Sequence, residues 1–362
     1  MKILHISSEK TWRGGEQQIA YLIAELKGRG VESVVASRSG SVFHEYCRNL
    51  GLPQVALGFK SEFDVLTAYG IKTFAEEQKV DLIHLHTAKG HGLAVVASAL
   101  GLKVPMALSK RTDFPIKPNW FSRFKYNHPS VKRILCVSRK IKEIIDPDLN
   151  DPHRSTVVYS GVDQQKFKFE RKNFFHELLS LSPQIKLVGN TSAIADQKDY
   201  FTFVRTAKRV CQRRPDVRFL IIGTGPMESE IRAFVKEEQL EEKVLFTGFL
   251  VNLPEVLFNL DVFLITSKTE GLGTSILDAH ACRVPVVGTD AGGIGEIVIS
   301  GKTGSLCPVA DDGCLSEKVL ERLADRELFE APAFVENFSK AATAEKTFRV
   351  YQDILAHAKL EI

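Results

Sequence analysis

The sequence contains few cysteines, and none of them has the spacing of a metal site. Its six cysteines are scattered over 362 residues without Cys-x-x-Cys or Cys-x-x-His pairs, which argues against structural zinc. Most lie in apolar segments such as Ile134–Val137, where a buried, reduced thiol is the expected state. Reduced thiols are typical of a reducing compartment, so we expect a cytoplasmic protein without a disulfide framework.

Long apolar runs are missing as well. No stretch approaches the roughly 18 to 20 residues that a membrane-spanning helix needs. The segment Met1–Ile6 turns polar at once and is expected to be a first strand and not a signal peptide. Low-complexity tracts and repeats of about 20 to 50 residues are also absent, which excludes solenoid architectures. We therefore expect a soluble protein that reaches a membrane only peripherally, on its inner face.

Charge is nearly balanced over the whole chain but not along it. The net charge is +4, and the excess of cations is concentrated between Lys103 and Lys142, where Asp113 is the one acid. Within this stretch, the segment 114–126 mixes aromatic and basic residues, as surfaces on anionic membranes do. A solvated helix with its aromatic residues in the core is an equal alternative. Nucleic acid is disfavoured, because no recognition module accompanies the charge.

The composition is that of a globular protein, and the length predicts two domains. Short β-branched runs alternate with amphipathic segments, which indicates an α/β fold with parallel sheets. We expect an N-terminal domain over 1–165, a C-terminal domain over 166–340 and a last helix over about 341–362 that packs back on the first domain. The expected strands are Lys2–Ser7, Glu32–Ser37, Asp81–His86, Val104–Ser109, Arg133–Ser138, Thr156–Tyr159, Ile185–Gly189, Val217–Gly223, Lys243–Thr247, Val262–Thr266 and Val284–Gly288.

The segment 269–278, Thr-Glu-Gly-Leu-Gly-Thr-Ser-Ile-Leu-Asp, carries the strongest functional signal. It follows an expected strand and opens a helix, so its glycines allow close backbone approach and the helix start offers free N–H groups for a phosphate. Thr274 and Ser275 add hydroxyl donors. Glu270 and Asp278 are carboxylates suited to sugar or ribose hydroxyls. This combination favours a ligand site over an ordinary helix cap.

The downstream residues carry a family resemblance. Val284-Pro285-Val286-Val287, the turn Gly292-Gly293-Ile294-Gly295-Glu296 and the loop Gly301-Lys302-Thr303-Gly304 follow the acid-x7-acid element. With these motifs the chain resembles the retaining GT-B glycosyltransferases of family 4, also called glycosyl transferases group 1. The resemblance implies two Rossmann-like parallel-sheet domains that face a central cleft, with an N-terminal acceptor domain and a C-terminal nucleotide-sugar domain.

The resemblance also implies roles for individual residues. Glu270 should contact the donor sugar, Asp278 the ribose, and Lys198 should neutralise charge on the departing diphosphate, so that no metal or cofactor is needed. Leu250 and the loop around Gly225 should flank the nucleoside. The residues implied as catalytic are Lys198, Glu270 and His86, and those implied as donor-binding are Gly15, Asn190, Gly225, Leu250, Gly271, Leu272, Gly273, Thr274 and Asp278.

Asn190 and His86 need separate comment. Family members carry an Arg where this chain has Asn190, and an amide supplies no charge; Arg111 and Lys302 are candidates for the replacing cation. His86 ends a strand, and in the family the corresponding His reaches the donor sugar. His84 alternates with it across the strand and is expected to be structural. We expect no metal site at this His-x-His pair, since no further ligand is evident.

The function that follows is transfer of a hexose or N-acetylhexosamine-type sugar, with retained configuration, from a UDP- or GDP-sugar. The expected acceptor is a glycan or lipid-linked glycan in cell-surface polysaccharide synthesis. Two alternatives stay open: a sugar-nucleotide epimerase on the same fold, and a non-catalytic sugar-nucleotide-binding protein. A nucleic-acid binder ranks last.

Overall fold

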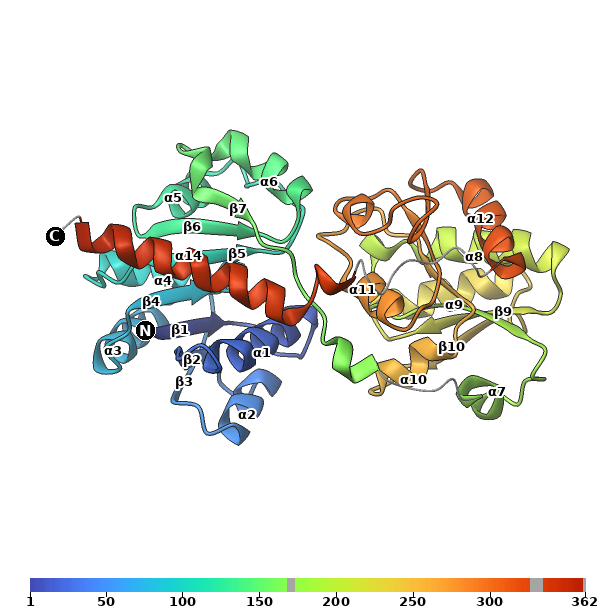
Figure 1. Cartoon of the computed structure of the whole chain (residues 1–362), viewed down its shortest axis with the longest axis horizontal. Helices are drawn as coiled ribbons and strands as arrows, with labels where there is room; N and C mark the ends of the chain where they lie inside the picture. Colours follow the sequence, from blue (N-terminus) through green and yellow to red (C-terminus); the bar gives the residue numbers. More distant parts are fainter. Residues whose placement is uncertain (168–172, 326–334, 361–362) are drawn as a thin grey trace. The chain divides into compact units, whose positions relative to one another are not determined.

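The computed structural model describes residues 1–167, 173–325 and 335–360. The chain divides into two compact units (Figure 1). The first unit consists of Met1–Gly161 and Lys340–Ile362, and the second of Val162–Ser339. Residues 168–172, which follow the expected domain boundary at 165/166, lie outside the described residues.

The first unit is built on a seven-stranded parallel sheet. The strand order is β3-β2-β1-β4-β5-β6-β7, so the direction of winding changes between β1 and β4. Register pairs His5 of β1 with His84 of β4. The strands are β1 (Lys2–Ser7), β2 (Glu32–Arg38), β3 (Gln54–Leu57), β4 (Leu82–Leu85), β5 (Met106–Lys110), β6 (Val131–Cys136) and β7 (Ser155–Val157).

Helices cover this sheet, and the chain's last helix is one of them. Helix α14 packs beside α1 and contacts β6, and its buried Tyr351 and Ile354 join Ile3, Leu82 and Ala107 in one apolar cluster. The helices are α1 (Gly14–Lys27), α2 (Val42–Asn49), α3 (Val65–Glu77), α4 (Ala88–Ala99), α5 (Trp120–Asn127), α6 (Arg139–Ile145) and α14 (Lys340–Leu360), with the 3₁₀ helices η1 (Asp146–Asp148) and η2 (Pro152–Arg154).

The second unit has a six-stranded parallel sheet in the order β10-β9-β8-β11-β12-β13, with its change of direction between β8 and β11. Its strands are β8 (Lys186–Asn190), β9 (Val217–Ile222), β10 (Val244–Gly248), β11 (Val262–Ile265), β12 (Val286–Thr289) and β13 (Gly304–Cys307). Its helices are α7 (Phe174–Leu178), α8 (Tyr200–Arg213), α9 (Glu228–Glu237), α10 (Leu253–Phe258), α11 (Thr274–Ala281) and α12 (Asp312–Ala324), with η3 (Gln164–Phe167), η4 (Asp196–Lys198) and η5 (Ile294–Glu296).

The predicted architecture of two parallel α/β sheets is confirmed, and the structure adds two strands that the sequence pattern did not indicate. Both β3 and β13 lie at the edge of a sheet. An edge strand pairs on one side only and is short, so its apolar run is weak. In β3 no residue is fully buried, and β13 begins with a glycine and a serine.

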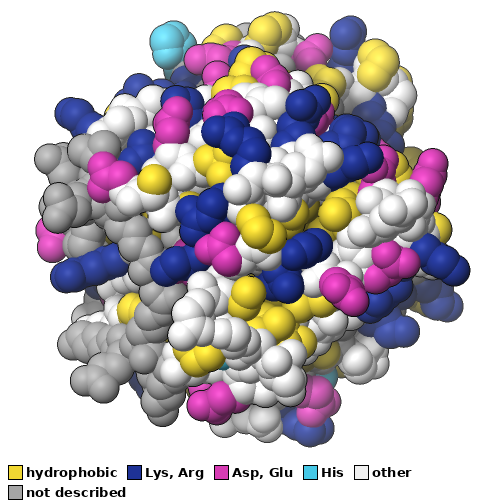
Figure 2. Space-filling model, turned by 90° about the vertical axis from the view of Figure 1, so that its right-hand side faces the viewer, with side chains coloured by type: hydrophobic (Ala, Val, Ile, Leu, Met, Phe, Trp, Pro, Cys, Tyr) yellow, Lys and Arg dark blue, Asp and Glu magenta, His cyan; other side chains and the backbone are white. Residues whose placement is uncertain are grey.

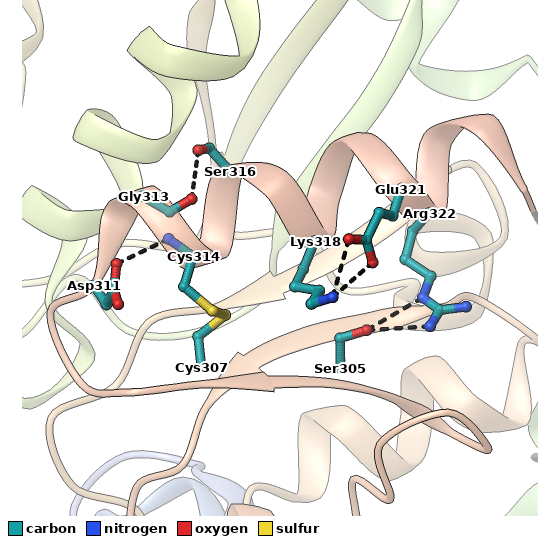
Figure 3. The surroundings of a disulfide bond; sticks show 9 residues. All are labelled: Ser305, Cys307, Asp311, Gly313, Cys314, Ser316, Lys318, Glu321 and Arg322. Carbon is teal, nitrogen blue, oxygen red and sulfur yellow. Dashed lines mark hydrogen bonds and ion pairs between the residues drawn. A yellow bond between two sulfur atoms is a disulfide. The ribbon is translucent and has the colours of Figure 1, made fainter.

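The expectation of uniformly reduced thiols is wrong for one pair of cysteines. Cys307 at the end of β13 and Cys314 in the first turn of α12 form a disulfide (Figure 3). The pairing arises because the chain turns back over the strand end within seven residues, a local path that Cys spacing alone does not reveal. The other four cysteines are free, and three of them, Cys47, Cys136 and Cys282, are buried.

The surfaces of the two units differ in character. In the second unit, cations of α8 pair with acids of α12, as Arg209 does with Asp312, and Figure 2 shows basic and acidic side chains interspersed over this face. In the first unit, four aromatic rings adjoin one another at α5 and before α3: Phe63, Trp120, Phe121 and Phe124, here called the aromatic patch. Among the described residues no helix is long and apolar enough to cross a membrane.

Candidate functional site

The second unit brings a cation and an acid together where its sheet changes direction. Lys198 ends η4, in the loop that follows β8, and Glu270 lies in the loop that follows β11. Because β8 and β11 are the neighbouring strands at the switch point, these loops flank the position where doubly wound sheets bind ligands. The Lys198 ammonium forms an ion pair with the Glu270 carboxylate, and both side chains are largely but not fully buried, at 17% and 16% exposure.

The two loops are held together by backbone contacts as well as by this pair. The Thr266 hydroxyl, just beyond β11, donates to the carbonyls of Lys198 and Asp199 at 3.0 and 2.9 Å. The Lys268 amide donates to the Gln197 carbonyl at 2.9 Å. These bonds hold the backbone at Lys198 next to the loop that carries Glu270.

The start of α11 lies directly after Glu270. Gly273 occupies the N-cap position with φ 86°, a left-handed conformation that favours glycine. Thr274 is the first helical residue, and Gly271 and Leu272 are buried before it. The Glu270 carbonyl accepts a hydrogen bond from the Gly293 amide at 2.9 Å. The glycine-rich turn after β12 therefore supports the Glu270 loop.

Asp278 lies one helical turn beyond Thr274. Burial raises the pKa of its carboxyl to about 7, and the nearby Lys166 charge opposes this shift. The ionised carboxylate is thus poorly solvated, and hydroxyl groups that donate hydrogen bonds to it would favour that form. A ribose supplies such hydroxyls.

Three other residues implied as donor-binding have different surroundings. Asn190 is 1% exposed; its amide donates to the Leu264 carbonyl at 2.8 Å and accepts from the Tyr200 hydroxyl at 3.4 Å. A Cβ on Gly225 would lie 2.2 Å from the Ile194 carbonyl oxygen, so this glycine permits packing between two loops. Leu250 is partly buried between two exposed neighbours, Phe249 and Val251.

The two candidate replacing cations belong to different units. Lys302 is exposed in the loop between η5 and β13. Arg111 belongs to the first unit, directly after β5.

In the first unit, His86 belongs to a cluster of three buried histidines, His5, His84 and His86. The expectation that His84 and His86 alternate across the strand is wrong: β4 ends at Leu85, and the two rings lie 4.0 Å apart. His5 completes the cluster, with its Nδ1 3.1 Å from His86 Nε2. No sequence motif marks His5, which joins the cluster through the register of β1 with β4.

Burial lowers the pKa of all three imidazoles, that of His5 to about 3. One ring nitrogen from each lies close enough to the others to bind a metal ion. Both nitrogens of His84, however, already form hydrogen bonds, to the Tyr351 hydroxyl at 2.5 Å and to Ser109 Oγ at 2.8 Å. His84 thereby ties α14 to the sheet, which is a structural role. His86 Nδ1 is buried and has no hydrogen-bond partner.

Gly15 is the second residue of α1, the helix that follows β1. Strand β1 lies beside β4, where the first sheet changes direction. A Cβ there would meet nothing within 4 Å, so packing does not demand the glycine. The next residue, Glu16, is buried and accepts hydrogen bonds from Ser7 Oγ at 3.0 Å and from the Arg13 amide at 3.3 Å. Burial raises the pKa of the Glu16 carboxyl.

Two parallel-sheet units with a Lys–Glu pair and a glycine-rich helix start at the second switch point define a nucleotide-sugar-dependent glycosyltransferase. Family models agree over almost the whole chain: residues 12–166 match Glycosyltransferase Family 4, and residues 174–343 match Glycosyl transferases group 1. The chain belongs to this family.

Individual relatives are distant but similar over most of their length. The N-acetyl-alpha-D-glucosaminyl L-malate synthase of Bacillus anthracis is 24% identical over 333 residues, covering 88% of this chain and 85% of that protein. An Escherichia coli UDP-Gal:alpha-D-GlcNAc-diphosphoundecaprenol alpha-1,3-galactosyltransferase is 24% identical over 68% of this chain and 65% of its own.

A solved structure shows the same fold. Anabaena HepE in complex with UDP and glucose superposes with a TM-score of 0.83 at 17% identity, covering 98% of this chain and 100% of that chain. At this identity the likeness concerns architecture alone, which is that of GT-B glycosyltransferases.

Proposed function

We propose that this glycosyltransferase moves a hexose or N-acetylhexosamine-type sugar from a UDP- or GDP-sugar to a glycan or lipid-linked glycan acceptor, in cell-surface polysaccharide synthesis. The Lys198–Glu270 pair carries the proposal, because it places a cation and a hydroxyl acceptor at the switch point, directly before the start of α11. The relatives support it: the E. coli relative is named for UDP-Gal and a diphosphoundecaprenol-linked acceptor, and the Anabaena structure contains UDP and glucose.

The chemistry assigned to the second unit is charge stabilisation. Lys198 neutralises the negative charge that develops on the departing diphosphate, and it does so without a metal. Glu270 exchanges its bond to Lys198 for the donor sugar's hydroxyls. Residues Gly271–Thr274 hold the diphosphate through backbone amides, and Asp278 accepts from the ribose. Leu250 and the Gly225 loop border the nucleoside.

The transfer is proposed to retain anomeric configuration. The departing phosphate oxygen then assists the incoming hydroxyl on the same face of the sugar, and His86 contacts the sugar through its unpaired Nδ1. Asn190, whose amide is engaged inside the second unit, supports the end of β8 instead of binding phosphate. Loss of anomeric configuration in the product would refute retention.

We also propose peripheral attachment to an anionic membrane through the aromatic patch. Trp120 and Phe124 are 75% and 41% exposed and stack on each other at 5.3 Å, so these two aromatic residues of α5 are not in the core. Lys117 and Arg123 lie on the same stretch and are exposed. Aromatic rings at the interface with cations on lipid phosphates would place a membrane-bound acceptor near the enzyme.

The test of the transferase is a panel of UDP-, GDP-, ADP- and dTDP-sugars with EDTA present. A donor that raises the melting temperature and slowly releases nucleoside diphosphate identifies a metal-independent transferase and its donor. An isomerised sugar would indicate the epimerase. Stabilisation without release, even with glycan acceptors added, would indicate a binding protein, and no response to any donor would contradict the proposal.

A further inference from the structure

Arg111 is a partly buried cation without a counter-ion, and its Nε atom is fully buried. It directly follows β5, so it lies at the carboxyl edge of the first sheet, beside the strand that leads to His86. Its one hydrogen bond among the described residues runs to Ser160 Oγ at 3.4 Å, and its Nε is buried without a partner. Within the described part of the chain, no carboxylate oxygen lies within 4.0 Å of the guanidinium.

The groups around Arg111 do not neutralise it. Burial lowers the pKa of Arg111 to about 10, so it is still protonated at neutral pH. The imidazoles of His84 and His86 stay neutral because burial lowers their pKa well below the usual range. The charge of Glu16 acts to raise the pKa of Arg111. The two carboxylate oxygens of Glu16, however, already accept hydrogen bonds from Ser7 Oγ and from the Arg13 amide.

Other buried cations of the same unit are satisfied. Lys125 pairs with Glu62 at 3.0 Å, and Lys110 donates to Thr112 Oγ1 and to the Phe114 carbonyl, both at 2.9 Å. Withdrawing part of a guanidinium from water without an anion to compensate it is unfavourable. Such a cation persists where a ligand supplies the missing negative charge, and its planar fork suits the paired oxygens of phosphate and carboxylate.

We propose that Arg111 binds an anionic group of a substrate, a phosphate or a carboxylate, at the carboxyl edge of the first sheet. The inference rests on the proposed transferase function, because the anion belongs to one of its two substrates. It is either the diphosphate of the donor or an anionic group on the acceptor. Ser160, already bonded to Arg111, is a second donor for that anion.

The test uses the full-length protein with inorganic phosphate and malonate as probes, titrated at constant ionic strength and followed by thermal unfolding. Arg111→Gln removes the charge and Arg111→Lys keeps it; Arg48→Gln, at an exposed position of α2, is the matched control. We expect both probes to stabilise the wild type and the control, and Arg111→Gln to weaken that response at least tenfold. Without any anion, Arg111→Gln should melt above the wild type, because a partly buried charge without a counter-ion is gone.

Adding UDP distinguishes whether the anion that Arg111 binds belongs to the donor or to the acceptor. Competition between UDP and phosphate, with weaker UDP binding in Arg111→Gln, assigns the donor diphosphate. Unchanged UDP binding and donor hydrolysis, with reduced sugar transfer, assign the acceptor. Equal probe binding by Arg111→Gln and the wild type would overturn the proposal, as would an anion-free variant that melts below the wild type, or a wild type that binds neither probe. Because these titrations need no sugar donor, their result can be interpreted even if the transferase assay fails.

Discussion

Lys198 and Glu270 form an ion pair, and the proposed function gives each charge another partner during turnover: the departing diphosphate for Lys198 and the sugar hydroxyls for Glu270. In the structure each satisfies the other, so the site is electrostatically balanced before a substrate arrives. A donor that brings a diphosphate and sugar hydroxyls replaces both partners at once. Under the proposed function the pair is an exchange site, and the bonds from Thr266 and Lys268 hold the backbone of the two loops together.

Substitution of Lys198 tests this role. Lys198→Ala should lower turnover by about 10²-fold or more, because the charge on the departing diphosphate then lacks its counter-ion. The control is Lys268→Ala, which removes a more exposed lysine from an ion pair with Asp196 in the same region. Turnover is measured as release of nucleoside diphosphate in the presence of acceptor. Near-normal activity of Lys198→Ala would remove this lysine from the mechanism.

Asp278 gives a pH dependence with a definite sign. Its pKa is raised to about 7 in the folded state from about 4 in an unfolded chain, so the folded protein binds the proton more tightly. Stability therefore falls as pH rises through this interval. Asp278→Asn should remove the effect and be more stable than the wild type at about pH 8 by about 2 kcal/mol more than at about pH 5.

Thermal unfolding of Asp278→Asn at both pH values, without nucleotide, measures the difference. Asp290→Asn makes the same chemical change at an exposed position of the same unit and should leave the wild-type dependence intact. A constant stability difference between Asp278→Asn and wild type across this pH range would contradict the raised pKa.

At the scale of single residues, the sequence predicts which side chains carry functional groups better than it predicts which residues they contact in the fold. Motifs single out Lys198 and Glu270, but only the strand order places their two loops at one switch point. His5 carries no motif and enters its cluster through the register of β1 with β4. Asn190 occupies a motif position, yet its amide faces the Leu264 carbonyl inside the unit. Such contacts depend on residues more than 70 positions apart.

At the scale of elements, β13 and α12 behave as one linked piece. The disulfide joins the strand end to the first turn of the helix, and Asp311 caps the same turn by accepting from the Cys314 amide at 2.8 Å. Further along α12, Arg322 donates to Ser305 Oγ of β13. The Cys307 carbonyl also accepts from the Asp290 amide at 2.8 Å, which connects this piece to the turn that supports Glu270.

Removing the disulfide should destabilise the contact between β13 and α12. A loop of this length restricts the unfolded chain by about 2 to 3 kcal/mol, so Cys307→Ser/Cys314→Ser should lower the free energy of unfolding by that amount. Hydrogen exchange of α12, with and without dithiothreitol, locates the effect. The double variant itself should not respond to dithiothreitol, and alkylation of denatured, unreduced wild type should modify four of the six cysteines. Six modified cysteines would show that the pair is reduced.

Elements follow from the sequence where they are buried and periodic. At the sheet edges the sequence predicts β7 and β10 but misses β3 and β13. The central strands β1, β4, β8 and β11 are almost wholly buried, and their continuous apolar runs predict them. Strands β3 and β13 pair on one side only, so selection for apolar residues is weaker. The sequence does not predict the disulfide for another reason, because the pairing depends on the conformation of a turn and follows no rule of cysteine spacing.

At the scale of the whole molecule, the chain returns to its first unit after completing the second. Helix α14 is held there by Tyr351, which bonds His84, and by the ion pair of Asp353 with Arg133 at 2.6 Å. The first unit therefore needs both ends of the chain. Its surface carries the aromatic patch, in which Trp120 is 75% exposed and Phe124 is 41% exposed.

The exposed patch predicts how the molecule distributes between solution and lipid. Burying two aromatic side chains in a membrane interface contributes several kcal/mol at most, and cations nearby add an attraction that salt screens. We expect the protein to float with vesicles rich in phosphatidylglycerol, to bind phosphatidylcholine vesicles less, and to lose binding as salt rises.

Trp120→Ser/Phe124→Ser should reduce the bound fraction at least tenfold while donor binding is unchanged. The matched control is Phe249→Ser/Val251→Ser, because these residues of the second unit are 73% and 88% exposed but lie outside the patch. Equal flotation of the two double variants would show that exposure of apolar side chains in general, and not the patch, drives association. Absence of any preference for anionic vesicles in the wild type would refute membrane attachment and leave a soluble glycan as the acceptor to test.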